Sequence, residues 1–342
     1  MFPLDPHNAL DWLHTAGWLP VGESAEILPL AWGVSNVVLR IEPESSPPFV
    51  LKQSREQLRT RDPWFSRLDR IWREADAMRV LQPLFPPGRI PKVLREDRPN
   101  YVFSMEAAPA EHTVWKQSLL QGELRGDVAL RLGRDLAQIH TQTAGKPELC
   151  LPFADRQVFV ELRVDPFYDR VVQAAPEVRV PLERMIDQMF ETQICLVHGD
   201  FSPKNVLLTE RGIVLVDFET VHFGDPAFDL GFFLSHLLLK TVLHLDRFEA
   251  AAALSEQFWR GYLARLDECQ AHPILSPETI VRRTMPHLAG CMWARIDGTS
   301  KIDYLPQPGQ QEGVRAFCRG LLLNPPGDWG EVLNRLKVGK FG

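Results

Sequence analysis

Several features are scarce or missing in this sequence of 342 residues, and each absence excludes a class of protein. The five cysteines are scattered and form no CxxC pair and no Cys/His spacing typical of zinc sites. We therefore expect free thiols in a reducing compartment. The most apolar run, LGFFLSHLLL, is much too short to span a bilayer, and the start lacks a basic region followed by an apolar run. These absences predict a cytoplasmic protein without a membrane partner.

An excess of positive charge is missing as well. The formal net charge is −6 and the pI is near 6.0, so no overall basic field favours nucleic acid as a partner. The mild acidic balance is compatible with a cationic substrate but does not require one. Internal repeats, low-complexity tracts and long charge runs are also absent, which leaves an ordinary globular protein.

The first hundred or so residues have the pattern of strands around one long helix. Short runs rich in β-branched residues at 36–42, 48–52 and 100–107 predict strands. Asp62 and Pro63 form a helix start signal, an N-cap carboxylate followed by proline at the first helical position. Apolar residues at helical spacing continue to Leu81, and the prolines that follow end the predicted helix.

After about residue 108 the pattern becomes mostly helical, with one short β interruption. Residues 205–209 and 213–218 predict two strands of a hairpin around a turn that contains Gly212. The predicted helices lie near 126–142, 156–174, 181–193, 227–241, 245–268, 277–296, 311–323 and 328–337.

The hairpin carries the residues with the clearest chemistry, within LVHGDFSPKNVLLTERGIVLVDFE at 196–219. Asp200 lies on a loop, Asn205 at the entrance of the hairpin, and Asp217 at the predicted end of its second strand. Transfer of a phosphoryl group from ATP needs a carboxylate near the attacking hydroxyl and oxygen ligands that hold Mg²⁺. Asp200 suits the first task, and Asn205 and Asp217 suit the second, because the antiparallel hairpin can bring them together. Each residue alone could be a turn or cap former, but the ordered set favours catalysis.

This segment resembles the catalytic region of the aminoglycoside phosphotransferase and choline kinase superfamily. His198-Gly199-Asp200 with Asn205 is similar to its catalytic loop, and Asp217-Phe218-Glu219 to its counterpart of the protein-kinase DFG segment. The resemblance implies that Asp200 is the catalytic base or orients the hydroxyl, while Asn205 and Asp217 bind Mg²⁺. Downstream, GDPAFDLGFF at 224–233 resembles the acidic continuation of the family, in which Asp225 and Asp229 would support the loops.

The same resemblance implies a nucleotide site in the first part of the chain. A strand lysine binds the ATP phosphates in this fold and pairs with a helix glutamate, and Lys52 and Glu74 have the matching types, order and elements. An ordinary strand-end lysine and a solvated glutamate are the alternatives, since Asp69 and Asp76 lie on the same predicted helix.

Two further segments are candidates for nucleotide contacts. Residues 31–41 occupy the place of a phosphate-covering loop but hold only one glycine, Gly33, and so depart from GxGxxG. Backbone groups from Gly33 to Asn36, with Ser35 and Asn36 as side-chain donors, could contact phosphate, and a plain strand-turn-strand is an equal alternative. The segment at 101–109 resembles the hinge that holds adenine through its main chain, with Met105, Glu106 and Ala107 as the candidates.

The acceptor is less constrained. LKQ at 51–53, before a tryptophan-containing segment and a long helix, resembles methylthioribose kinases, whereas DFE followed by GDPAFDLG is more similar to the general aminoglycoside phosphotransferase-like group. Acidic residues of the C-terminal region would favour an amine, although solvation at the surface explains each of them as well. These residues are Glu161, Asp165, Asp297 and Asp303.

Together these patterns predict an α+β protein with a protein-kinase-like two-lobed fold. Residues 1–107 form the expected small β-rich nucleotide-binding lobe, and residues 108–342 the larger, mainly helical lobe for catalysis and acceptor binding. The expected reaction is transfer of the γ-phosphoryl group of ATP, with Mg²⁺, to a hydroxyl of a small molecule such as an aminoglycoside or amino sugar. A protein Ser/Thr kinase is disfavoured by HGD, by DFE and by the lack of an APE segment, and an ATP-binding pseudoenzyme by the intact catalytic set.

Overall fold

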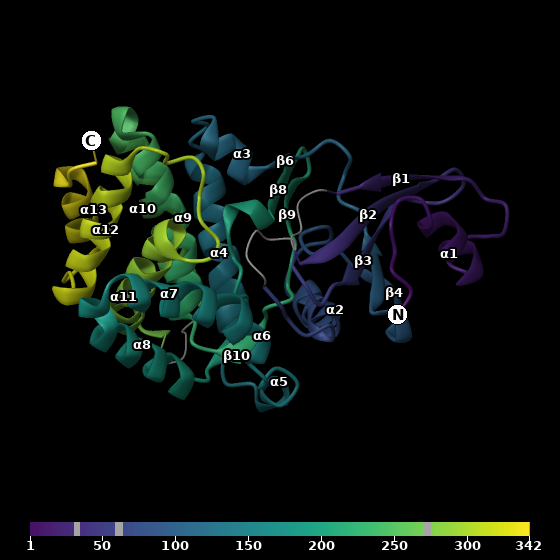
Figure 1. Ribbon diagram of the computed structural model, residues 1–342, viewed down its shortest axis with the longest axis horizontal. Helices are drawn as coiled ribbons and strands as arrows, with labels where there is room; N and C mark the ends of the chain where they lie inside the picture. Colours follow the sequence, from purple (N-terminus) through teal and green to yellow (C-terminus); the bar gives the residue numbers. More distant parts are fainter. Residues whose placement is uncertain (31–34, 59–63, 270–274, 342) are drawn as a thin grey trace. The chain divides into compact units, whose positions relative to one another are not determined.

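The computed structural model describes residues 1–30, 35–58, 64–269 and 275–341, so Gly33, Asp62 and Pro63 lie outside the described residues. The chain divides into two compact units (Figure 1). The first unit comprises Met1–Thr113 and Leu207–Thr220, and the second comprises Val114–Val206 and Val221–Gly342. The segment 207–220 thus belongs with the N-terminal unit, although it follows the loop of Asp200 in the chain.

A five-stranded antiparallel sheet forms the centre of the first unit, in the order β1-β2-β3-β5-β4. The three predicted strands are present as β2, β3 and β5, whereas β1 and β4 at the two edges were not predicted. The strands are β1 (Ala25–Pro29), β2 (Asn36–Pro43), β3 (Phe49–Ser54), β4 (Val93–Asp97) and β5 (Val102–Glu106).

Successive side chains of β3 point to opposite faces of this sheet, and the two faces have different surroundings. Leu51 belongs to a buried apolar cluster that contains Leu39 of β2 and Leu13 of helix α1 (Ala9–Thr15), another element the sequence did not predict. Because successive side chains of a strand point to opposite faces, Lys52 points away from this cluster. The apolar core on one face therefore fixes a buried lysine on the other.

The long helix of the first unit is shorter than predicted. Helix α2 spans Arg70–Leu81 and ends before the prolines, as expected. It does not begin near residue 63, because residues 64–66 are extended and pair with 56–58 through the bridge between Gln57 and Phe65. These backbone hydrogen bonds compete with helix formation, so the predicted helix is wrong for residues 64–69.

The predicted hairpin is present as β8 (Val206–Thr209) and β9 (Gly212–Leu215), which are neighbours in a three-stranded sheet that also contains β6 (Thr113–Val114). The second strand ends earlier than predicted. Asp217 lies two residues beyond it, with φ of +72°, a left-handed conformation that a non-glycine residue seldom adopts. The carboxylate is therefore positioned by a turn and not by the strand.

The second unit is built of helices around α9, in which every residue from Ala227 to Val242 is buried. A helix that is apolar on all sides needs neighbours on all sides, and α10 and α11 both pack against it. A short two-stranded sheet of β7 (Cys195–Val197) and β10 (His222–Gly224) lies in the same unit. Its helices are α3 (Trp115–Leu120), α4 (Gly126–Thr143), α5 (Pro147–Cys150), α6 (Gln157–Phe159), α7 (Arg170–Ala174), α8 (Arg179–Glu191), α9 (Ala227–Leu243), α10 (Phe248–Glu268), α11 (Pro277–Asp297), α12 (Pro308–Leu323) and α13 (Trp329–Val338).

Most helices of this unit lie where the sequence predicts them, but the one expected at 156–174 is not a uniform α-helix. Between α6 and α7 the residues Val160–Asp169 form a π-helix with Pro166 inside it. Proline has no N–H group, so the regular hydrogen bonding of an α-helix cannot continue through it. The wider turn presents Arg163 to the loop of Asp200, as described below.

Among the described helices, none alone is long and apolar enough to cross a membrane. Ala227–Leu243 and Leu245–Glu268 meet that criterion only when they are taken as a pair, which is bent by 96°.

Candidate functional site

Lys52 is the centre of a buried ionic cluster in the first unit. Its Nζ lies 2.7 Å from Oδ1 of Asp217 and 2.7 Å from Oε2 of Glu74, and both Lys52 and Glu74 are buried. Burial lowers the pKa of Lys52, but the surrounding carboxylates have the larger combined effect, so the pKa lies above its ordinary value. Burial raises the pKa of Glu74 to about 7, against the opposing effect of Lys52. The ion pair between Lys52 and Glu74 that the resemblance implies is present.

Glu219 connects this cluster to the start of β2. Ser35 Oγ donates a hydrogen bond of 2.7 Å to Glu219 Oε1, and Asn36 Nδ2 donates one of 2.8 Å to Oε2. Arg70, which is fully buried at the first position of α2, donates from Nε to the same carboxylate over 3.1 Å. The side chains of Ser35 and Asn36 are thus engaged by a carboxylate, and this leaves their backbone N–H groups as the more direct candidates for phosphate.

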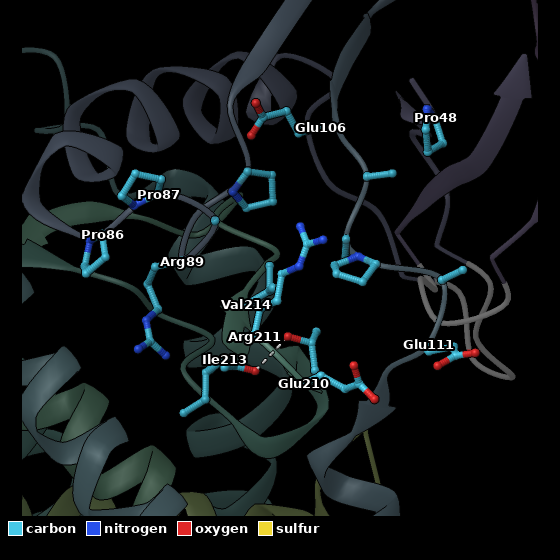
Figure 2. Close-up of a pocket in the computed structure, with 18 of the residues that line it drawn as sticks. Pro48, Pro86, Pro87, Arg89, Glu106, Glu111, Glu210, Arg211, Ile213 and Val214 are labelled. Carbon is cyan, nitrogen blue, oxygen red and sulfur yellow. Dashed lines mark hydrogen bonds between the residues drawn. The ribbon is translucent and has the colours of Figure 1, made fainter. Parts of the chain in front are cut away.

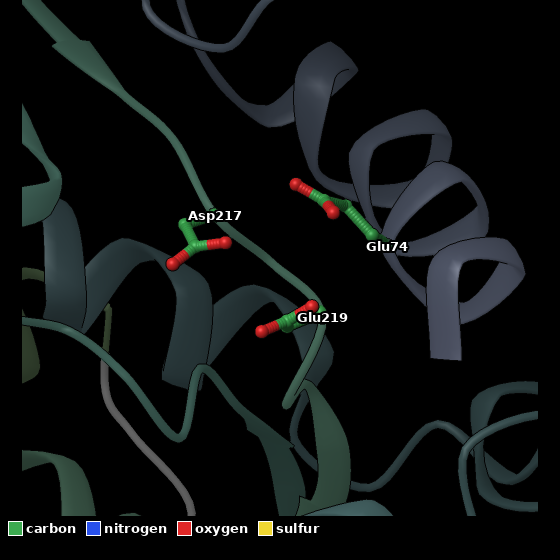
Figure 3. A group of neighbouring side chains, drawn as sticks. All are labelled: Glu74, Asp217 and Glu219. Carbon is green, nitrogen blue, oxygen red and sulfur yellow. The ribbon is translucent and has the colours of Figure 1, made fainter. Parts of the chain in front are cut away.

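Three carboxylates of the first unit could share a metal ion. Oxygens of Glu74, Asp217 and Glu219 all lie within 4.8 Å of one another (Figure 3). A set of carboxylate oxygens suits a hard cation such as Mg²⁺. Of this set, the sequence predicted only Asp217 as a metal ligand. Glu219 was missed, although its place two residues after Asp217 in DFE was a signal that could have suggested it.

The predicted hinge leads out of β5. Met105 is buried and pairs with Val50 of β3, and Glu106 binds the backbone of Lys92 through its own N–H and its carboxylate. Glu106 and Ala107 also border a pocket of about 730 Å³, whose lining includes residues 86–89, 108–111 and 209–214 (Figure 2). Met105 is not part of this lining.

Asp200 lies in the second unit, where it is buried and held on both of its oxygens. Arg163 Nη2 lies 2.7 Å from Oδ1 and forms an ion pair with it, although the angles do not suit a hydrogen bond. Lys204 Nζ lies 2.8 Å from Oδ2. Asn205 Nδ2 donates to the backbone oxygen and to Oδ2 of Asp200, over 2.9 and 3.0 Å. The structure therefore brings Asp200 and Asn205 into direct contact, which fixes the carboxylate in one orientation.

Asp229 of α9 holds the loop that carries Asp200 through hydrogen bonds. The backbone N–H groups of His198 and Gly199 donate to its two carboxylate oxygens, over 2.7 and 2.8 Å. Burial acts to raise the pKa of Asp229, but hydrogen bonds, that of His140 first, bring it below the ordinary value. The predicted supporting role of Asp229 is confirmed. His140 is buried and contacts both Asp229 and Tyr262.

Two cations at Asp200 were not predicted. Arg163 also donates to the backbone oxygen of Gly199 over 2.7 Å, and its guanidinium lies over the rings of Phe167 and Phe232. Lys204 stands within the motif itself, so its position next to Asn205 was a usable signal. The sequence held no such signal for Arg163, because it lies 37 positions before Asp200 and the π-helix brings the two together.

The acidic residues considered for the acceptor have separate surroundings. Asp297 is held by the guanidinium of Arg315 and by the indole N–H of Trp293. Glu161 accepts a hydrogen bond from Gln157. Burial first, and then the neighbouring Asp169 and Glu161, raise the pKa of Asp165.

Comparison with known proteins places this geometry in context. Residues 26–273 match the phosphotransferase enzyme family APH. The methylthioribose kinase of Yersinia pseudotuberculosis is 26% identical over 240 residues, which cover 60% of this chain and 57% of that protein. The methylthioribose kinase of Exiguobacterium sibiricum is 24% identical over 246 residues, or 63% of this chain and 61% of that one. The chain thus spans about three fifths of the length of these relatives.

Solved structures share the fold at low identity. A choline/ethanolamine kinase family protein from Mesorhizobium loti is 17% identical, with a TM-score of 0.53 and coverage of 98% of this chain and 100% of the other. The amicoumacin kinase hAmiN is 16% identical, with a TM-score of 0.56 and coverage of 96% and 97%. The predicted α+β, protein-kinase-like fold is confirmed. Since the family match extends over most of the sequence, the chain belongs to the APH phosphotransferase enzyme family.

Proposed function

We propose that the protein transfers the γ-phosphoryl group of ATP to a hydroxyl of a small molecule. The observation that carries this proposal is that each unit contains its own set of contacting charged and polar side chains. One set joins Lys52 to Glu74 and Asp217, and the other joins Asp200 to Asn205. The first unit, with the hinge at Met105, Glu106 and Ala107, is the proposed nucleotide-binding part, and the helical unit the part that binds the acceptor.

In the proposed reaction the acceptor oxygen attacks the γ-phosphorus in line, the bond to the bridging oxygen breaks, and ADP leaves. Asp200 orients the hydroxyl and takes its proton, while Arg163 and Lys204 hold the carboxylate in place. Lys52 binds the ATP phosphates, and Glu74 fixes its position. Mg²⁺ is the expected divalent cation of the family and would offset phosphate charge, held by Asp217 and Asn205, with Glu219 as a further candidate ligand.

The proposed acceptors are small molecules with a free hydroxyl group. Aminoglycosides, amino sugars and methylthioribose are the first candidates, because the recognised superfamily and the methylthioribose kinase relatives point to them. Location in the cytoplasm stays a prediction.

The test is formation of ADP by the purified protein with Mg²⁺, ATP and a panel of alcohols, in the presence and absence of EDTA. Asp200→Asn keeps the shape of the side chain but removes the proton acceptor, so we expect turnover to fall by at least ~100-fold. Asp187→Asn removes an exposed carboxylate of α8 and serves as the matched control. Full turnover in Asp200→Asn contradicts the mechanism. Tight ATP binding without turnover on any acceptor favours a pseudoenzyme instead.

A further inference from the structure

A buried lysine without a carboxylate partner lies in the second unit. Lys240 of α9 is 1% exposed, and its Nζ contacts the hydroxyl of Tyr304 at 3.0 Å and the face of the same ring at 4.8 Å. Within the described part of the chain, no Asp or Glu lies at ion-pair distance from it. Burial first, and then the charges of Arg295 and Lys116, bring the pKa of Lys240 well below its ordinary value.

Arg295 of α11 is a second cation for which the described residues provide no carboxylate at ion-pair distance. Its Nη1 donates to Ser300 Oγ over 2.8 Å and its guanidinium is 6.0 Å from the ring of Phe167, but Nε has no hydrogen-bond partner. Asp297, which lies on the same helix, is occupied by Arg315. Arg295 is thus a partly buried guanidinium with an unused donor.

These two cations belong to the surroundings of Asp200. The carboxylate of Asp200 and the guanidinium of Arg163 both act on the pKa of Arg295, in opposite directions, although burial has the largest effect. Lys204, which pairs with Asp200, and Lys116 of α3 both act on the buried His236, one turn before Lys240. Contacts link the same residues: Arg295 and Arg163 lie over one ring, that of Phe167, and Arg163 pairs with Asp200. His236, one turn before Lys240, packs on Phe232, the other ring under Arg163.

Carboxylates in this group are too few to neutralise it. Asp200 is already paired with Arg163 and Lys204. Asp303 is exposed and acts on Lys116, where it opposes the effect of burial. A buried charge without a partner is costly, and the cost is recovered when a ligand brings the opposite charge.

We propose that the acceptor carries an anionic group, a carboxylate or a phosphate, and that Lys240 and Arg295 bind it while its hydroxyl faces Asp200. Lys116 and Lys204 are more exposed, and their positive charges favour the approach of an anion. This inference rests on the proposed function and names the class of its substrate. It differs from the cationic acceptor with which the acidic composition is compatible.

One sugar scaffold with different charges tests the inference directly. Glucuronate, glucose 6-phosphate, glucose and glucosamine are compared by their effect on the melting temperature of the protein and by calorimetric titration. We expect glucuronate or glucose 6-phosphate to raise the melting temperature more than glucose, and glucosamine to have the least effect. The two anionic arms distinguish a carboxylate site from a phosphate site. Equal effects of the neutral and anionic sugars, or a larger effect of glucosamine, overturn the inference.

Substitutions test whether Lys240 and Arg295 bind the anion. Lys240→Met and Arg295→Met should each weaken binding of the preferred anion by at least ~10-fold, because a charge-assisted contact is lost. Lys337→Met removes an exposed lysine of α13 in the same unit and should change nothing. Lys240→Met should also raise the melting temperature of the free protein, since it removes a buried amino group whose protonated form has no carboxylate partner. Unchanged anion binding in both Met variants overturns the assignment.

The outcomes separate this inference from the proposed function. Acceptor-stimulated ADP formation without any preference for anions keeps the kinase and overturns the anionic acceptor. An anion preference that is lost in Lys240→Met, together with no turnover on any acceptor, keeps the anion site and overturns the kinase.

Discussion

Lys52 forms ion pairs with two carboxylates, those of Glu74 and Asp217. Lys52→Met removes this cation from the buried Glu74 and the partly buried Asp217, and we expect a loss of about 3–5 kcal/mol in the free energy of unfolding. Acceptor-stimulated turnover should fall by at least ~100-fold, because the phosphate contact is lost as well. Urea denaturation and ADP formation measure the two effects.

Lys92→Met is the control for this change, since Lys92 is an exposed lysine of the same unit. Its effect on stability should stay within about 0.5 kcal/mol. The loss in Lys52→Met should shrink as the pH falls, because protonation of Glu74 relieves the repulsion. Equal stability of the two variants contradicts the cluster as a source of stability.

Residues within a local motif could be predicted, and residues joined only by the fold could not. Lys52 and Glu74 were found because each has a recognisable type on a recognisable element, and the structure pairs them. Asp200 and Asn205 were found because they lie only five positions apart in one motif. Arg163, Lys240 and Arg295 come from three separate helices, and each alone is an ordinary cation. Their common surroundings exist only after the helices pack.

At the level of elements, the crossing of α4 and α10 depends on two glycines. A Cβ added to Gly133 would lie 2.0 Å from the backbone oxygen of Phe258, and one added to Gly261 would lie 2.0 Å from that of Leu130. Backbone atoms cannot give way as a flexible side chain can, so the helices must separate. We expect Gly133→Ala to destabilise the protein by about 3 kcal/mol or more, measured by chemical denaturation.

Gly320 of α12 is the matched control, since nothing lies within 4 Å of an added Cβ there. Gly320→Ala should be neutral or stabilise by up to about 1 kcal/mol, because alanine favours a helix more than glycine does. Similar effects of the two alanines would show that helix propensity, and not the close crossing, decides the result.

Elements with a strong period were predictable, and those that depend on pairing were not. The apolar spacing in α4, α9 and α11 found these helices because packing reinforces the local preference. Residues 64–66 belong to the same predicted helix as the residues of α2, yet they pair with 56–58 and remain extended. The edge strands β1 and β4 are partly exposed, so alternation between apolar and polar residues is weak in both. The π-helix at 160–169 keeps a helical composition, and only the hydrogen-bond pattern reveals it.

For the whole molecule, net charge says little about the charge at any one site. The formal charge of −6 is compatible with a cationic acceptor but does not require one, because it sums residues over the entire sequence. The cations near Asp200 lie together in the second unit, and several are partly or fully buried, so their local effect is opposite in sign to the total. A local surplus of this kind matters more for binding, since burial weakens the screening by solvent.

The stability of the molecule should depend on a buried histidine of the second unit. His287 is 2% exposed and its Nδ1 lies 2.9 Å from the hydroxyl of Tyr168. Burial lowers the pKa of His287 from 6.5 to about 4, with Asp225 opposing this effect and Arg283 adding to it. The unfolded chain therefore takes up a proton near pH 6.5, whereas the folded protein stays neutral down to about pH 4.

Because the unfolded state binds more protons in this window, the contribution of His287 is complete above pH 6.5 and is lost as the pH falls toward 4. The loss between pH 7 and pH 4.5 should be about 3 kcal/mol. His287→Asn retains an acceptor for Tyr168 but cannot be protonated, so urea denaturation should give a flatter stability curve over this range. The carboxylates titrate alike in both proteins, and the difference between the two curves isolates the histidine. Parallel curves from pH 7 to pH 4.5 would mean that His287 accepts its proton in the folded protein as readily as in the unfolded chain.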